Sequence, residues 1–219
     1  MNELLGQLIN LLAATQLLLV FAMISQRRIL SLIHLFTLQG ITLVAATALA
    51  GHATHQSHLY VSAGLTLVLK VLLIPWMLHR MIRRLNVRWD VEPLINVPTT
   101  MLIGIGLVMF SFNVAQPIAQ LSSSIARGTL GIALACVLLS FLMMITRSKA
   151  VPQVIGFLSM ENSLFFAATA ATYGMPMVVE FGIALDVLVG ILILGVFMLQ
   201  IREQFDSLDI RHLEKLKED

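Results

Sequence analysis

Long apolar stretches separated by short polar segments run through most of the chain. About 20 apolar residues are enough to cross the hydrocarbon core of a bilayer as a helix. The pattern therefore predicts seven transmembrane helices, at roughly 4–25, 29–50, 59–79, 99–118, 128–146, 152–172 and 178–201. The predicted fold class is an all-α integral membrane protein.

Composition agrees with a chain that lies in a membrane. Of the 219 residues, 58% are hydrophobic and 12% are charged, whereas roughly a quarter of the residues in soluble domains are charged. The formal net charge is +2, but the basic residues flank apolar stretches, so we predict no nucleic-acid site. The single cysteine, Cys136, lies in an apolar stretch and can form neither an intramolecular disulfide nor a cysteine metal cluster. His34 and Cys136 are interpreted as packing residues.

Lysine and arginine alternate between the two sides of the predicted spans. The basic residues of one side are Arg27, Arg28, Arg80, Arg83, Arg84, Arg88, Arg147, Lys149, Arg202, Arg211, Lys215 and Lys217. The other side has only Arg127. Since basic residues concentrate in cytoplasmic loops, the amino terminus is predicted outside and the carboxyl terminus in the cytoplasm.

The first three spans weakly resemble the last three. FAMISQRR, which ends the first span, is similar to FLMMITRSK, which ends the fifth, and Leu38-Gln39-Gly40 aligns with Met160-Glu161-Asn162. In the same alignment Lys70 falls opposite Asp186. Apolar helices also align by chance, so duplication and coincidence both stay open.

This alignment predicts four segments. Residues 1–98 form a three-helix unit with a cytoplasmic loop, and 99–127 form a connecting helix with an outside loop. Residues 128–201 form a second three-helix unit, and 202–219 form an amphipathic cytoplasmic tail that could lie on the membrane or dock on a partner.

Three ionisable side chains interrupt the apolar stretches: Lys70, Glu161 and Asp186. A charge near the middle of a membrane helix costs at least ~2.5–3.5 kcal/mol, so such a group usually faces protein or water and has a function. We therefore predict that these residues transfer protons or another cation. The alternative is that they only lock helices together, as hydrogen-bonding groups or as a static ion pair.

Several neighbours support this prediction. Gly182, Asp186 and Gly190 share one helix face, which would let another helix approach the carboxyl group. Glu180 is either the outer entrance of the path or a solvated residue at a helix start. Gln39 and Asn162 are candidate supporting residues, and Phe157 and Phe165 are expected to line the surroundings of Glu161. Pro75 frees the carbonyl of Val71 and is expected to kink the helix near Lys70.

We find no motif for enzymatic chemistry in the sequence. A nucleotide-binding loop, a zinc-protease helix and a nucleophile elbow are all missing. His52, His55 and His58 could gather around zinc or copper if their segment were helical, but a polar loop with incidental histidines is the alternative. No catalytic centre and no bound cofactor are predicted in this chain.

The second half, from IGFLSMENSLFF to FGIALDVLVGILIL, resembles the K-type membrane subunit of respiratory complex I and the C-type subunit of multisubunit cation/proton antiporters. These families have three helices with one acidic residue in the second and one in the third. The resemblance implies that Glu161 and Asp186 take those places. Asp186 departs from the pattern, since a glutamate is expected in the third helix, and its reach is shorter by one methylene.

Over nearly its whole length the chain resembles hydrogenase-4 component E, of formate hydrogenlyase and other membrane-bound [NiFe] hydrogenase complexes. The matching segments are KVLLIP from Lys70, Met160-Glu161-Asn162, and EFGIALD from Glu180 to Asp186. The resemblance implies antiporter-like subunits, an H-type membrane anchor and a cytoplasmic hydrogenase arm as partners. It also implies iron–sulfur clusters and a nickel–iron centre in those partners, none of them in this chain.

From the residues and the resemblance together, we expect a subunit of a complex I-related hydrogenase in a bacterial or archaeal plasma membrane. Its ionisable residues would belong to a proton or cation path coupled to redox chemistry in partner subunits. The alternatives are a structural scaffold that holds antiporter-like subunits together and a free-standing transporter.

Overall fold

The computed structural model describes residues 2–54, 57–85, 94–121 and 124–172, together with residues 188 and 195. These residues form helices joined by short connections, and they include no β-strand. The helices are α1 (Asn2–Ser25), α2 (Ile29–Thr54), α3 (Ser57–Thr66), the π-helix η1 (Leu67–Leu73), α4 (Ile74–Leu85), α5 (Val97–Leu121), α6 (Ser124–Thr146) and α7 (Ala150–Thr172). The predicted all-helical class is confirmed.

Five helical segments are long and apolar enough to cross a membrane. They are Leu4–Ser25, Ile29–His52, Leu59–Arg80, Val97–Pro117 and Thr129–Thr146, and they coincide with the first five predicted spans. Helix α7 coincides with the sixth, 152–172, although it is not one of the five. The seventh predicted span, 178–201, and the tail 202–219 lie outside the described residues, so seven spans and the orientation stay predictions.

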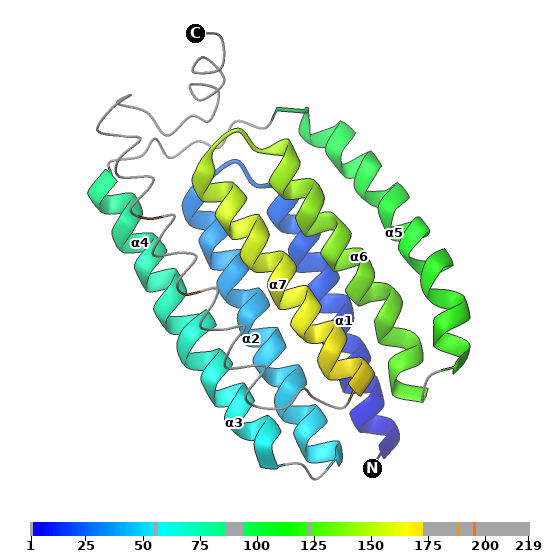
Figure 1. Cartoon of the computed structure of the whole chain (residues 1–219). Coiled ribbons are helices and arrows are strands. Elements are labelled where there is room, and N and C mark those ends of the chain that lie inside the picture. Colours follow the sequence, from blue (N-terminus) through cyan, green and yellow to red (C-terminus); the bar gives the residue numbers. More distant parts are fainter. Residues whose placement is uncertain are drawn as a thin grey trace, which may run out of the picture.

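The centre of the bundle consists of two helical hairpins. Helices α1 and α2 form one hairpin, α6 and α7 form the other, and α1 packs on α6 while α2 packs on α7 (Figure 1). The segment made by α3, η1 and α4 lies against α2, and α5 lies on the opposite side against α6. The central hairpins therefore supply most of the interior, and Lys70 approaches it from η1.

Two apolar clusters fill this interior at different heights. The first includes Met23, Ile24, Phe36, Leu139 and Leu158. The second is formed by Ala13, Leu43, Ala46, Ala133, Phe165 and Phe166. Along α1, α2 and α7, buried polar residues lie between the parts of the helix that belong to the two clusters. We call these residues, with Lys70, the polar layer: Gln16, Gln39, Lys70, Ser159, Glu161, Asn162 and Ser163.

Arg147 joins the two hairpins at one end of the bundle. Its side chain is buried, and Nη2 donates hydrogen bonds to the carbonyls of Ile24 at 2.5 Å and Met23 at 3.4 Å. These carbonyls end α1, where a cation is favourable because the helix dipole is negative. Burial, and then the charge of Arg27, lower the pKa of Arg147 to about 10, so the group stays charged at neutral pH. The sequence pattern indicated only a topological role for this residue.

Gly40 allows α2 to approach η1 closely. A Cβ atom at this position would lie 3.1 Å from Cγ2 of Val71 and 3.7 Å from the carbonyl oxygen of Lys70. A glycine here therefore brings the backbone of α2 against the residue that carries the buried amine.

We expect Gly40→Leu to destabilise the protein by about 1–3 kcal/mol, because the larger side chain must separate α2 from η1. Gly106→Leu is the matched control, since nothing lies within 4 Å of a Cβ atom built at Gly106 in α5. Unfolding in mixed micelles of increasing SDS content, followed by circular dichroism, measures both. Equal stability of the two variants would contradict the close approach.

Candidate functional site

Lys70 is carried by a segment of π-helix within a predicted membrane span. The N–H of Ile74 donates to the carbonyl of Leu69, five residues earlier, where an α-helix would bond four residues back. Pro75 follows directly in α4 and has no N–H to donate to the preceding turn. The expected distortion near Pro75 thus takes the form of a wider helix over Leu67–Leu73. Such π-segments are frequent at functional sites.

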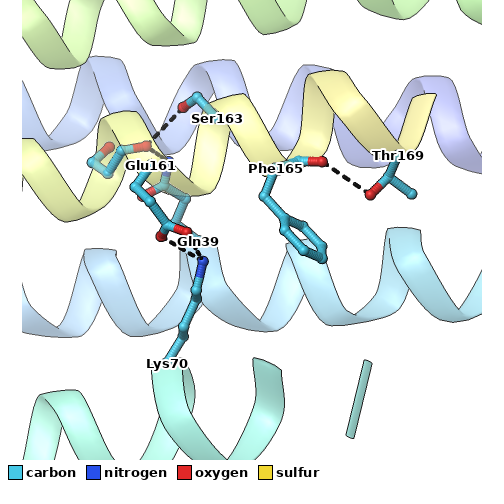
Figure 2. A network of polar contacts seen from close by, with 7 residues as sticks. Gln39, Lys70, Glu161, Ser163, Phe165 and Thr169 are labelled. Carbon is cyan, nitrogen blue, oxygen red and sulfur yellow. Dashed lines mark hydrogen bonds and ion pairs between the residues drawn. The ribbon is translucent and has the colours of Figure 1, made fainter. Parts of the chain in front are cut away.

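The amine of Lys70 forms a buried ion pair with Glu161 of α7. Lys70 Nζ donates to Oε1 at 2.5 Å and also to Oε2 (Figure 2). The side chains of Lys70 and Glu161 are 3% and 9% exposed, so the ion pair is almost completely buried inside the bundle. The sequence left open whether these residues meet, and the structure brings them together from η1 and α7.

Phe165 completes the surroundings of the amine. It follows Glu161 by one helical turn, and its ring centroid lies 5.1 Å from Lys70 Nζ. A ring face at this distance attracts a cation, so α7 offers the amine a carboxylate and an aromatic ring. Phe157 was expected to line the same site, but this expectation is wrong: its side chain is 41% exposed.

Two glutamines connect the central hairpins in the polar layer. Gln16 Nε2 donates to the carbonyl of Gln39 at 3.0 Å, and Gln39 Nε2 donates to the carbonyl of Ser159 at 3.3 Å. Figure 2 shows Gln39 beside the Lys70–Glu161 pair. These two hydrogen bonds connect α1 to α2 and α2 to α7. On α7 they end at Ser159, less than one helical turn before Glu161.

Serine hydroxyls continue the layer around α7. Ser159 Oγ and Ser140 Oγ of α6 are 2.8 Å apart, and Ser163 Oγ donates to the carbonyl of Ser159 at 2.8 Å. All three residues are buried. Four helices and η1 therefore contribute buried polar residues at the level of the bundle that contains the carboxylate.

Several polar atoms of this interior are only partly satisfied. Among the described residues, no hydrogen-bond partner exists for Oε1 of Gln16, Oε1 of Gln39, Oγ of Ser62 or either amide atom of Asn162. An unsatisfied buried polar group costs about 1–3 kcal/mol. Such atoms normally form hydrogen bonds to water or to another polar group. The unsatisfied atoms of this layer could therefore bind a water molecule.

The predicted site residues have different outcomes. Lys70, Glu161 and Gln39 lie together, and Asn162 is buried in the same layer, where its side-chain amide has no hydrogen bond to a described residue. Asp186 and Glu180 lie outside the described residues. Sequence reasoning missed Gln16, although a lone amide in the middle of an apolar span is a signal of the same kind as Gln39.

Of the three histidines in the candidate metal segment, the structure describes the side chain of His52. His52 is exposed, and its Nδ1 lies 3.3 Å from the hydroxyl of Tyr60. His55 and the side chain of His58 are outside the described part. No group of three His, Cys, Asp or Glu side chains suited to a metal ion occurs within the described ranges.

The fold and the polar layer define a multi-pass α-helical membrane protein with an ion pair in its interior. The chain is 32% identical over 208 residues to the uncharacterized protein Rv0085 of Mycobacterium tuberculosis (strain ATCC 25618 / H37Rv), with 94% of each chain covered. The protein therefore belongs to the family that includes Rv0085.

A more distant similarity covers the same length. The chain is 22% identical over 212 residues to hydrogenase-4 component E of Escherichia coli (strain K12) and of Shigella flexneri, covering 97% of this chain and 98% of theirs. This supports the resemblance inferred from the motifs, while similarity to K-type and C-type subunits stays a prediction. No family model and no solved structure matches the chain.

We expect Lys70→Met and Glu161→Gln each to destabilise the protein by about 3 kcal/mol, because each leaves a buried group without its partner. The double variant should be more stable than the sum of the single effects predicts, by at least about 1 kcal/mol. Leu72→Met, at an exposed position of η1, is the control and should change stability by less than about 0.5 kcal/mol. Strict additivity in SDS unfolding would mean that the pair is not formed.

Proposed function

We propose that this protein is a membrane subunit of a complex I-related hydrogenase complex, in which Lys70, Glu161 and Asp186 belong to a proton-transfer path. The observation that carries the proposal is the buried Lys70–Glu161 ion pair within a predicted membrane span. The full-length similarity to hydrogenase-4 component E supports the assignment to a hydrogenase complex.

The pair can exist in two protonation states of equal net charge. In one, the ammonium group of Lys70 faces the carboxylate of Glu161. In the other, a proton has moved from Nζ to a carboxyl oxygen, leaving a neutral amine and a neutral acid. Burial penalises the charged state and the attraction between the two opposite charges favours it, so a charge that changes nearby in the complex shifts the balance. A shift of this kind moves a proton between η1 and α7.

Hydroxyl groups extend from Lys70 along α3. Ser62, Thr66 and Lys70 follow one another at four-residue intervals, and all three are buried. Residues with this spacing share one face of a helix. Ser62 Oγ has no hydrogen-bond partner among the described residues. This polar stripe supports a path from the ion pair toward the end of the bundle where α2 and α3 are joined.

The hydrogen bonds of Gln16 and Gln39 suggest a second branch of the proton path, which leads from the ion pair toward α1. Gln39 and Gln16 lie in the polar layer on the side of α1, and each has an unsatisfied Oε1 atom. Water bound to these oxygens would continue a hydrogen-bonded chain beyond Glu161. Asp186 and Glu180 keep the role that the sequence indicates, with the acid in the last span as the next proton site and the glutamate as the outer entrance.

The proposed partner subunits would supply the rest of the proton path and the redox centres. Antiporter-like subunits and an H-type anchor would continue the path through the plasma membrane of a bacterium or archaeon. A cytoplasmic hydrogenase arm would hold the iron–sulfur clusters and the nickel–iron centre. The scaffold alternative has one observation in its favour, since the same ion pair also fixes η1 to α7.

We expect Glu161→Gln, Lys70→Met and Asp186→Asn to reduce proton translocation in inverted membrane vesicles about tenfold or more, since each removes a group that can exchange a proton. The rate is divided by the amount of assembled complex, measured on native gels, because Lys70→Met and Glu161→Gln are also expected to lower stability. Phe157→Leu, on the exposed side of α7, is the control. Assembled variants that translocate protons at the full rate would refute the proton path.

Thr66→Val separates a path from a static pair. This change removes one buried hydroxyl at nearly constant volume and leaves Lys70 and Glu161 in place. If protons use the stripe on α3, translocation should fall severalfold while stability decreases by only about 1 kcal/mol. A scaffold role predicts undiminished translocation in this variant.

A further inference from the structure

A groove between α2 and α4 opens at the end of the bundle that contains Arg147. Its volume is about 620 Å³, and it is lined by Ile33, His34, Thr37, Pro75, Trp76, His79 and Arg80. This volume lies within the range of pockets that bind small ligands. The interpretation of His34 as a packing residue is wrong, because its side chain is exposed and lines this groove.

The lining of the groove favours a negatively charged group. Arg80 provides a positive charge, His34 adds an imidazole group, and none of the lining residues that the structure describes is acidic. The guanidinium of Arg80 lies 5.4 Å from the ring centroid of Trp76. This cation–π contact holds the charge at the mouth of the groove, so less conformational freedom is lost when an anion binds.

The position of the groove indicates an amphiphile. The apolar span Leu59–Arg80 ends at the groove, and Trp76 is 60% exposed, as is typical of tryptophan at a membrane interface. One turn or more deeper, exposed apolar side chains continue from both walls. They are Leu38 and Ile41 on α2, and Val68 and Leu72 on η1. A soluble anion would use only the charged end of this surface.

We propose that the groove binds the headgroup of an anionic phospholipid, with its acyl chains along the apolar strip between α2 and η1. The phosphate would lie against Arg80 and the imidazole of His34, as basic pockets between membrane helices bind acidic headgroups. This site does not depend on proton transfer through Lys70. Pro75 lines the groove directly after the π-helix, so a bound lipid would contact the segment that positions the amine.

The test uses the full-length protein, purified with any subunits that accompany it and reconstituted in phosphatidylcholine vesicles. Spin-labelled phosphatidylglycerol and spin-labelled phosphatidylcholine are added in turn, and electron paramagnetic resonance measures the fraction of each lipid held at the protein surface. We expect a preference for phosphatidylglycerol that falls about fivefold in Arg80→Gln, as the loss of one basic residue near a membrane surface implies. His34→Ala should reduce the preference further.

Arg28→Gln is the matched control, because it removes one exposed positive charge at the same end of the bundle but outside the groove. The proposal predicts that this variant keeps most of the preference. An equal decrease in Arg28→Gln and Arg80→Gln would indicate general attraction to the basic surface and would overturn the site. Complete displacement by millimolar inorganic phosphate would also overturn it, in favour of a soluble anion.

A photo-crosslinking amino acid in place of Trp76 identifies what covers the groove in native membranes. An adduct with an acidic phospholipid, lost in Arg80→Gln, supports the proposal. An adduct with a segment of this chain or with a partner subunit overturns it. Neither result bears on the proton path, which fails or holds according to the Lys70 and Glu161 variants.

Discussion

The structure depends on the cost of holding a charged amine inside an apolar bundle. Lys70 lies where neither end of its span is within easy reach, so its charge requires a partner in the interior. Glu161 provides the opposite charge, and Phe165 provides the aromatic face. The other members of the polar layer lie at the same level, between the two apolar clusters. The site therefore occupies a defined level of the bundle.

The helices are adapted locally to bring the two charges together. The π-helix places Lys70 and the first turn of α4 in a register that an unbroken α-helix would not give, and Pro75 fits directly after it. Gly40 lets α2 lie close to this segment, while Gln39, the preceding residue, bonds to α7. One short stretch of α2 thus contacts both helices that carry the ion pair.

The sequence predicted this architecture unevenly. Apolar length located the five membrane segments, and isolated polar residues in apolar stretches indicated Lys70, Glu161 and Gln39. Pairing could not be predicted, because Lys70 and Glu161 are 91 positions apart and nothing local fixes how α7 lies relative to η1. The π-helix was missed because proline predicts a distortion without specifying its form. Arg147 was assigned to topology, since the same residue type serves surface loops and buried helix ends.

Arg147 also holds the two hairpins together at one end of the bundle. Its guanidinium connects the end of α1 to the segment between α6 and α7, far from Thr54, where α2 ends, and from Ser57, where α3 begins (Figure 1). If one hairpin tilts against the other, the end that Arg147 holds is the pivot of the rotation. Displacement then grows with distance from the pivot, so a small rotation would part the helices least at Arg147 and most at the opposite rim.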